Sequence, residues 1–284
     1  MITIPPKLKT AYLDGSFGIF VGAGLSQGAG LPNWETLLLE LISHAQENDM
    51  LSDAKEADLL KLVKDSSKYL LVAEELREVL NTDLQKFIKK RFDDDSIEPT
   101  EVTKKTIRLK SKFIITTNYD TLMENSYIKV HSKMPNVLTY RDAATINYNI
   151  LSNIPFILKA HGDAKRAPNE IILTEKDYRS IIFKESGYQS VLHVLFSTSS
   201  ILFLGASLKD PELNLVLSYI HNIFHGGGPS HFALINSNEV TSVEKDRWRK
   251  DYNINIITYD PHDNHKEVEN LIDALILLDE TRTL

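Results

Sequence analysis

The sequence has no cysteine among its 284 residues. Without thiols the chain can form neither disulfides nor a thiolate zinc site, which excludes disulfide-stapled folds and four-cysteine zinc modules. The absence suits a reducing compartment, so we expect the protein to be cytoplasmic. Apolar runs of membrane-spanning length are missing too, and the start, "MITIPPKLKTAYLDG", lacks the apolar core of a signal peptide. We therefore expect no membrane association.

Positive charge is not in excess either. Lysine and arginine number 32 against 39 aspartate and glutamate residues, which gives a net charge of -7 at pH 7. A general electrostatic attraction to phosphates is therefore not expected, and we predict no direct binding of nucleic acid. The side chains are 42% hydrophobic and 25% charged, the balance of a globular protein with a sizeable core.

Six short apolar runs are typical of strands that are buried on both faces. They cover residues 17–21, 112–117, 155–160, 200–205, 230–236 and 254–259. Between several of them apolar residues recur at helical spacing, as in residues 34–45, where Asn33 is expected to be the N-cap. This alternation predicts an α/β fold with a Rossmann-like, doubly wound and mainly parallel sheet.

One region breaks the alternation. Residues from about 50 to 110 are rich in Leu, Lys, Glu and Asp and show no strand pattern, so we expect an all-helical subdomain inserted there. Residues 128–153 carry few signals and predict loops with short elements. We expect residues 1–284 to form a single domain with this helical insertion and with no zinc module.

A glycine-rich stretch, "FVGAGLSQGAGLPNW" at residues 20–34, follows the first predicted strand. In dinucleotide folds such a turn lets backbone N–H groups approach a pyrophosphate at the start of a helix. The spacing of Gly22, Gly24 and Gly28 departs from G-x-G-x-x-G, because the third glycine comes one residue late. No acidic residue ends a second strand about 20 residues later. The loop alone leaves open a nucleotide site and a plain strand-to-helix turn.

Polar residues follow three further predicted strands. They are Asn118 and Asp120 in "ITTNYDTL", His161 with Gly162 in "ILKAHGDA", and Ser207 and Asp210 with Gly205 in "LFLGASLKDPEL". Each has a simpler structural reading, because Asn, Asp and Ser cap helices and a lone histidine is commonly packed or exposed. However, the carboxyl ends of parallel strands meet at one edge of a sheet, where α/β folds bind ligands. We expect these side chains to converge.

Taken together and in this order, the motifs resemble the Sir2 (sirtuin-like) superfamily, and more closely its bacterial SIR2-like NADase branch found in antiphage defence systems. The matching segments are "GAGLSQGAGLPNW", "TTNYD", "KAHGD", "LGASLKDP" and "ALINSNE". The resemblance implies that NAD is the substrate and that the first segment lines its pyrophosphate and ribose. The residues concerned are Gly22, Ala23, Gly24 and Ser26.

The resemblance also implies roles for the other strand ends. Asn118 would lie beside the nicotinamide ribose with Asp120 supporting it, and His161 would be the general base. A neutral imidazole can take a proton from water or from a ribose hydroxyl, and an amide can orient either group, so no metal is needed. The residues expected to border the adenosine half are Gly205, Ser207 and Asn236.

Several departures from the deacetylating sirtuins favour another reaction. The chain cannot build their four-cysteine zinc module, Thr117 and Tyr119 replace residues of their T-Q-N-I-D motif, and Asn33 stands where "IPDF" has its acid. The expected reaction is hydrolysis of NAD to ADP-ribose and nicotinamide. Two alternatives stay open: an NAD-dependent protein deacylase or ADP-ribosyltransferase, and a catalytically silent subunit that binds NAD or ADP-ribose.

An NADase that is always active would be toxic, so we expect control from outside this chain. The sequence ends soon after the last predicted strand and is expected to lack a sensor domain of its own. This length pattern resembles SIR2-like subunits that are encoded beside a separate partner. The resemblance therefore implies a homo-oligomer and a partner such as a HerA-type hexameric ATPase or a short Argonaute.

Overall fold

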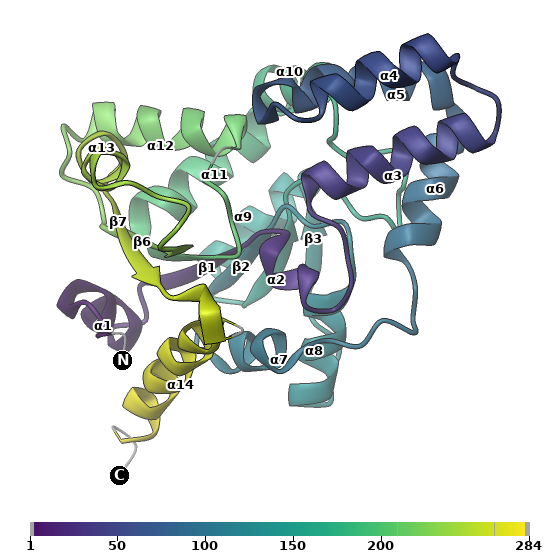
Figure 1. The fold of residues 1–284 in the computed structure, drawn as a ribbon. Helices are drawn as coiled ribbons and strands as arrows, with labels where there is room; N and C mark the ends of the chain where they lie inside the picture. Colours follow the sequence, from purple (N-terminus) through teal and green to yellow (C-terminus); the bar gives the residue numbers. More distant parts are fainter. Residues whose placement is uncertain (1–2, 209, 264, 282–284) are drawn as a thin grey trace.

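A computed structural model describes residues 3–208, 210–263 and 265–281. Its centre is a sheet of seven parallel strands in the order β3-β4-β2-β1-β5-β6-β7 (Figure 1). The strands are β1 (Phe17–Val21), β2 (Phe113–Thr116), β3 (Val137–Thr139), β4 (Phe156–Lys159), β5 (Ser200–Leu204), β6 (His231–Asn236) and β7 (Ile254–Tyr259). The predicted α/β, Rossmann-like fold is confirmed, and the sheet is parallel throughout.

Helices cover both faces of the sheet (Figure 1). One face carries α9 (Ala143–Leu151), α10 (Glu175–Lys184), α11 (Ser186–Thr198), α12 (Pro211–Ile223) and α13 (Ser242–Tyr252). The other carries α1 (Pro6–Leu13), α7 (Glu101–Arg108), α8 (Leu122–His131) and α14 (Lys266–Glu280). Within β1, Phe20 packs on the first face, whereas Ile19 and Val21 pack on the second. Burial on both faces explains why the strands are unbroken apolar runs.

Four helices gather beyond one end of the sheet, at the upper right of Figure 1. They are α3 (Trp34–Glu47), α4 (Asp53–Leu62), α5 (Tyr69–Leu80) and α6 (Thr82–Phe92), and they share a core of their own. Asn33 caps α3 as predicted, because its side chain accepts the N–H of Thr36 at 2.9 Å. Trp34 packs on the ring of Tyr69 at 5.6 Å between centroids. The division into one domain with a helical insertion stays a prediction.

The prediction for residues 128–153, loops with short elements, identified none of the elements that the structure shows there. This segment contains the end of α8, the edge strand β3 and the helix α9. In β3 only Leu138 is buried, while Val137 and Thr139 are half-buried. An edge strand of three residues with one buried side chain produces no apolar run, so the pattern that revealed the other strands was missing. Those six strands end within one residue of their predicted limits.

The direction in which the chain builds the sheet reverses at the sheet's centre. From β1 the chain first builds β2, β3 and β4 on one side and then crosses to β5 on the other side. In open α/β sheets, ligands bind where the direction of building reverses, outside the carboxyl ends of the strands. Here that point lies at the ends of β1 and its neighbours β2 and β5.

The length and apolar character of the helices were compared with what a membrane span requires. Within the ranges that the structure describes, none combines the length and apolar character needed to cross a membrane.

Candidate functional site

The glycine loop after β1 lies against the end of β5. The N–H of Gly22 donates to the carbonyl of Leu204 at 3.0 Å, and the N–H of Gly24 donates to that of Gly205 at 2.9 Å. A Cβ atom on Gly22 would lie 2.6 Å from the carbonyl oxygen of Gly205. The short helix α2 (Gly24–Gln27) starts in this contact. Close approach of two backbones therefore requires small residues here, independently of any ligand.

Replacing Gly205 by alanine tests this contact. Its φ of 61° is in the left-handed region, and an added Cβ would lie 2.4 Å from the backbone nitrogen of Leu25. Gly15 is a matched control, because its φ is 69° but nothing lies within 4 Å of an added Cβ. We expect Gly15→Ala to lower the free energy of unfolding by about 1–2 kcal/mol. Gly205→Ala adds overpacking of about 1–3 kcal/mol. Equal losses in urea denaturation would contradict the close contact.

Asn118 is held in a buried group of polar side chains behind the glycine loop. Its Nδ2 donates to Ser26 Oγ at 2.9 Å and to the carbonyl of Gly22 at 3.2 Å. Ser26 Oγ in turn donates to Asp120 Oδ2 at 2.9 Å, and the N–H of Leu122 donates to Asp120 Oδ1 at 2.9 Å. Burial raises the pKa of Asp120, against the opposing effects of these donors. The structure thus brings together the predicted residues Asn118, Ser26 and Asp120.

A buried lysine, which was not predicted from the sequence, supports the polar side chains around Asn118. Lys159, at the end of β4, is fully buried and lies between two acidic side chains. Its Nζ lies 2.7 Å from the carbonyl of Asp120, 3.1 Å from that of Tyr119, 3.0 Å from Glu124 Oε1 and 3.4 Å from Asp163 Oδ1. It therefore ties the segment after β2 to the segment after β4. A charged residue in the otherwise apolar run "FILKA" was the available signal.

His161 lies on the side of the sheet covered by α10, α11 and α12. It is 3% exposed, and its ring packs edge-on against Tyr178 with centroids 5.2 Å apart. The Nε2 atom lies 3.4 Å from Asp210 Oδ2 and 3.9 Å from Glu212 Oε2, and it finds no hydrogen-bond partner among the described residues. Burial lowers the pKa of His161, while the charge of Asp210 opposes this effect. The imidazole is therefore neutral at neutral pH, as a base must be.

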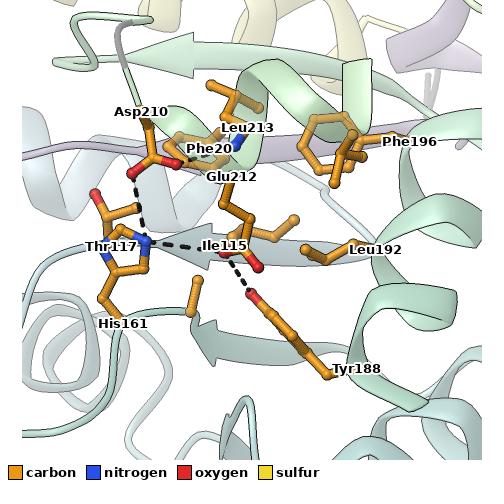
Figure 2. Close-up of a pocket in the computed structure, with 12 residues that line it drawn as sticks. Phe20, Ile115, Thr117, His161, Tyr188, Leu192, Phe196, Asp210, Glu212 and Leu213 are labelled. Atoms are coloured by element: carbon orange, nitrogen blue, oxygen red, sulfur yellow. Dashed lines mark hydrogen bonds and ion pairs between the residues drawn. The ribbon is translucent and has the colours of Figure 1, made fainter. Parts of the chain in front are cut away.

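A narrow cavity of about 10 Å³, room for about one water molecule, lies beside His161 between the sheet and α11 and α12 (Figure 2). Its polar lining consists of Thr117, His161, Tyr188, Asp210 and Glu212. The rest of the lining is apolar: Phe20, Ile115, Ala160, Leu192, Phe196, Leu213 and Val216. Asn118 is not among the described residues that line it. The two predicted catalytic residues thus have separate sets of contacts.

The remaining predicted residues lie along the same edge of the sheet. Ala23 is half-exposed between the two glycines of the loop, and Ser207 is exposed after the end of β5. Asn236, at the end of β6, makes local contacts: its Oδ1 accepts the N–H of Asn238 at 2.9 Å and its Nδ2 donates to Glu239 at 3.3 Å. Over the residues the structure describes, no cluster of three or more acidic or histidine side chains is arranged to hold a metal ion.

The chain also has relatives among known proteins. The NAD(+) hydrolase ThsA of Bacillus cereus (strain MSX-D12) is 30% identical over 233 residues, which are 80% of this chain and 44% of that protein. The ThsA of Enterococcus faecium is 28% identical over 240 residues, 81% of this chain and 45% of that protein. Defense-associated sirtuin 2 of Bacillus subtilis is 22% identical over 212 residues, 74% of this chain and 20% of that protein. The chain spans less than half the length of these relatives.

A family model for the SIR2-like domain matches residues 112–257, just over half of the chain. The match begins with β2 and runs into β7, so it includes Asn118, His161 and the segment that follows β5. The chain therefore belongs to the SIR2-like family.

Proposed function

We propose that the protein hydrolyses NAD at the bond between nicotinamide and ribose, releasing nicotinamide and ADP-ribose. The observation that carries the proposal is His161, a buried and neutral base whose Nε2 lies beside a cavity at the carboxyl edge of the sheet. The glycine loop reaches the same edge. The two ThsA relatives, 30% and 28% identical, are named NAD(+) hydrolases, and this supports the same reaction.

The chemistry balances with these residues. When the bond from the ribose carbon to the pyridinium nitrogen breaks, its electron pair goes to nicotinamide and leaves an oxocarbenium-like ribose. A water molecule adds to that carbon and loses a proton, which a neutral His161 accepts. Because the cavity side of His161 is lined mainly by apolar side chains, bulk water is kept from the reacting carbon.

The remaining residues are assigned to substrate binding. Gly22, Ala23, Gly24 and Ser26 would line the pyrophosphate and the ribose, where the glycines leave room for the substrate to lie close to the backbone. Asn118 would orient the nicotinamide ribose, with Asp120 holding Ser26 in place at 2.9 Å. The residues proposed for the adenosine half are Gly205, Ser207 and Asn236.

Turnover of NAD with identification of the products tests the proposed function. We expect ADP-ribose and nicotinamide in equal amounts, with no acceptor required. The assay is run with the protein alone and with the product of the neighbouring gene, and again with an acylated peptide. O-acyl-ADP-ribose would show a deacylase, and ADP-ribose attached to protein would show a transferase. Calorimetric binding of NAD without turnover under any of these conditions would show a silent binding subunit.

The biological role belongs to the proposal as well. Depletion of NAD would serve defence against phage; the name of the Bacillus subtilis relative, Defense-associated sirtuin 2, associates that protein with defence. We propose a cytoplasmic homo-oligomer controlled by a separate partner, such as a HerA-type ATPase or a short Argonaute. The net charge of -7 supports contact with nucleic acid through the partner rather than through this chain.

A further inference from the structure

One carboxylate beside the cavity is bound by three separate elements. Asp210 lies where the segment after β5 enters α12, and its Oδ1 caps that helix by accepting the N–H of Leu213 at 3.0 Å. Its Oδ2 accepts the hydroxyl of Tyr178, from α10, at 2.8 Å. The same Oδ2 lies 3.4 Å from His161 Nε2, beyond the end of β4 (Figure 2). A helix cap alone requires the first of these contacts and neither of the other two.

We propose that Asp210 is the positioning residue of His161 and that Tyr178 holds Asp210 in place. The ring of Tyr178 packs edge-on against the imidazole, while its hydroxyl binds the carboxylate. One side chain, that of Tyr178, therefore contacts both the imidazole and the carboxylate and holds the two groups next to each other. When His161 takes a proton, the carboxylate lies beside the positive charge and stabilises it. This inference rests on the proposed NAD hydrolysis and adds residues to the same site.

Among the groups around His161, Asp210 carries the negative charge, because the others are neutral at neutral pH. They are Thr117 after β2, Tyr178 on α10, Tyr188 on α11 and Glu212 on α12. Burial, with the charge of Asp210, raises the pKa of Glu212 to about 8, so its carboxyl group is mostly protonated at neutral pH. Burial also raises the pKa of Tyr178, which therefore stays a hydrogen-bond donor. The electrostatic effect on the imidazole therefore comes from the carboxylate of Asp210.

The Asp210→Asn variant isolates this charge. An asparagine still caps the helix through its amide oxygen, and its NH2 group, which takes the place of Oδ2, can donate to the hydroxyl of Tyr178, so folding is preserved. We expect kcat to fall roughly ten- to hundredfold, within the usual contribution of acid–base catalysis, with little change in KM. The reaction needs neutral His161, and loss of the carboxylate lowers the pKa of His161. The acidic limb of the kcat profile therefore moves to lower pH.

Two variants separate this role from others. Tyr178→Phe keeps the ring but removes the hydroxyl, and we expect a smaller fall in kcat in the same direction. Asp65→Asn is the matched control, because Asp65 is an exposed N-cap that accepts the N–H of Ser67 at 3.0 Å and has no contact with His161 in the described chain. We expect it to leave kcat and the pH profile unchanged.

An NMR titration of His161, assigned with His161→Gln, gives a readout that does not need turnover. We expect the pKa of His161 to be lower in Asp210→Asn than in the wild type. An unchanged pKa together with an unchanged kcat profile would overturn the positioning role. If Asp210→Asn lowers the pKa of His161 but the wild-type protein does not consume NAD, the proposed function is overturned while the Asp210–His161 coupling stands.

Discussion

Purified His161→Ala protein is expected to hydrolyse NAD roughly 10²- to 10⁴-fold more slowly than the wild type, which is the usual contribution of a general acid or base. The physical reason is that His161 is a neutral base at the cavity whose Nε2 has no hydrogen-bond partner among the residues described. KM should change little, since removing the base leaves the glycine loop intact. Initial rates of nicotinamide release measure both parameters.

Two comparisons make this result specific. His262→Ala removes a histidine whose side chain is 82% exposed, and we expect the wild-type rate. Asn118→Ala leaves Ser26 and the carbonyl of Gly22 without the amide that binds them, so both kcat and KM should suffer. Wild-type turnover by His161→Ala, in a protein that melts at the normal temperature, would contradict the assignment of the base.

Lys159→Met is expected to destabilise the fold by about 3–5 kcal/mol, the usual effect of removing one partner of a buried ion pair. Methionine is similar in length to lysine but leaves the carboxylate of Glu124 and the carbonyl groups of Tyr119 and Asp120 without their cation. Urea denaturation measures the free energy of unfolding. The same variant should also lose NAD turnover, because the lysine ties together the two strand ends that carry the proposed catalytic residues.

The loss of unfolding free energy in Lys159→Met should become smaller as the pH falls. Burial raises the pKa of Glu124, an effect that Lys159 opposes, so the variant allows the pKa to rise further. A protonated Glu124 needs no cation, and the difference between variant and wild type therefore narrows as the pH falls. Lys105→Met is the matched control: its partners, Glu269 and Asp273, are 20% and 48% exposed, and we expect a loss of about 0–1 kcal/mol. Equal losses would contradict a structural role for Lys159.

The local sequence pattern was sufficient where burial is complete along a strand. In β1 and β5 every residue is buried, so each appears as an unbroken apolar run with clear limits. It failed at β3, because this edge strand pairs with β4 alone and buries a single side chain.

For the candidate site, the sequence pointed to strand ends that the structure brings to one edge of the sheet, but not to the contacts that their side chains make. A helix cap was the simpler of the two roles open to Asp210; the carboxylate is a cap, yet it also lies beside His161. Tyr178 carried no signal at all, because its role depends on where α10 packs. A hydrogen bond between residues far apart in the chain has no local sequence signature.

Composition and periodicity by themselves determined the absence of thiol chemistry, the α/β class and the edge of the sheet where polar side chains gather, because these follow from residue types and from spacing along the chain. Only the tertiary structure decided the strand order, the burial of Lys159 between Glu124 and Asp163, and the separate surroundings of Asn118 and His161. These depend on which side chains approach each other after packing, and on how far packing removes them from water. Desolvation lowers the pKa of His161, and it exists only in the folded chain.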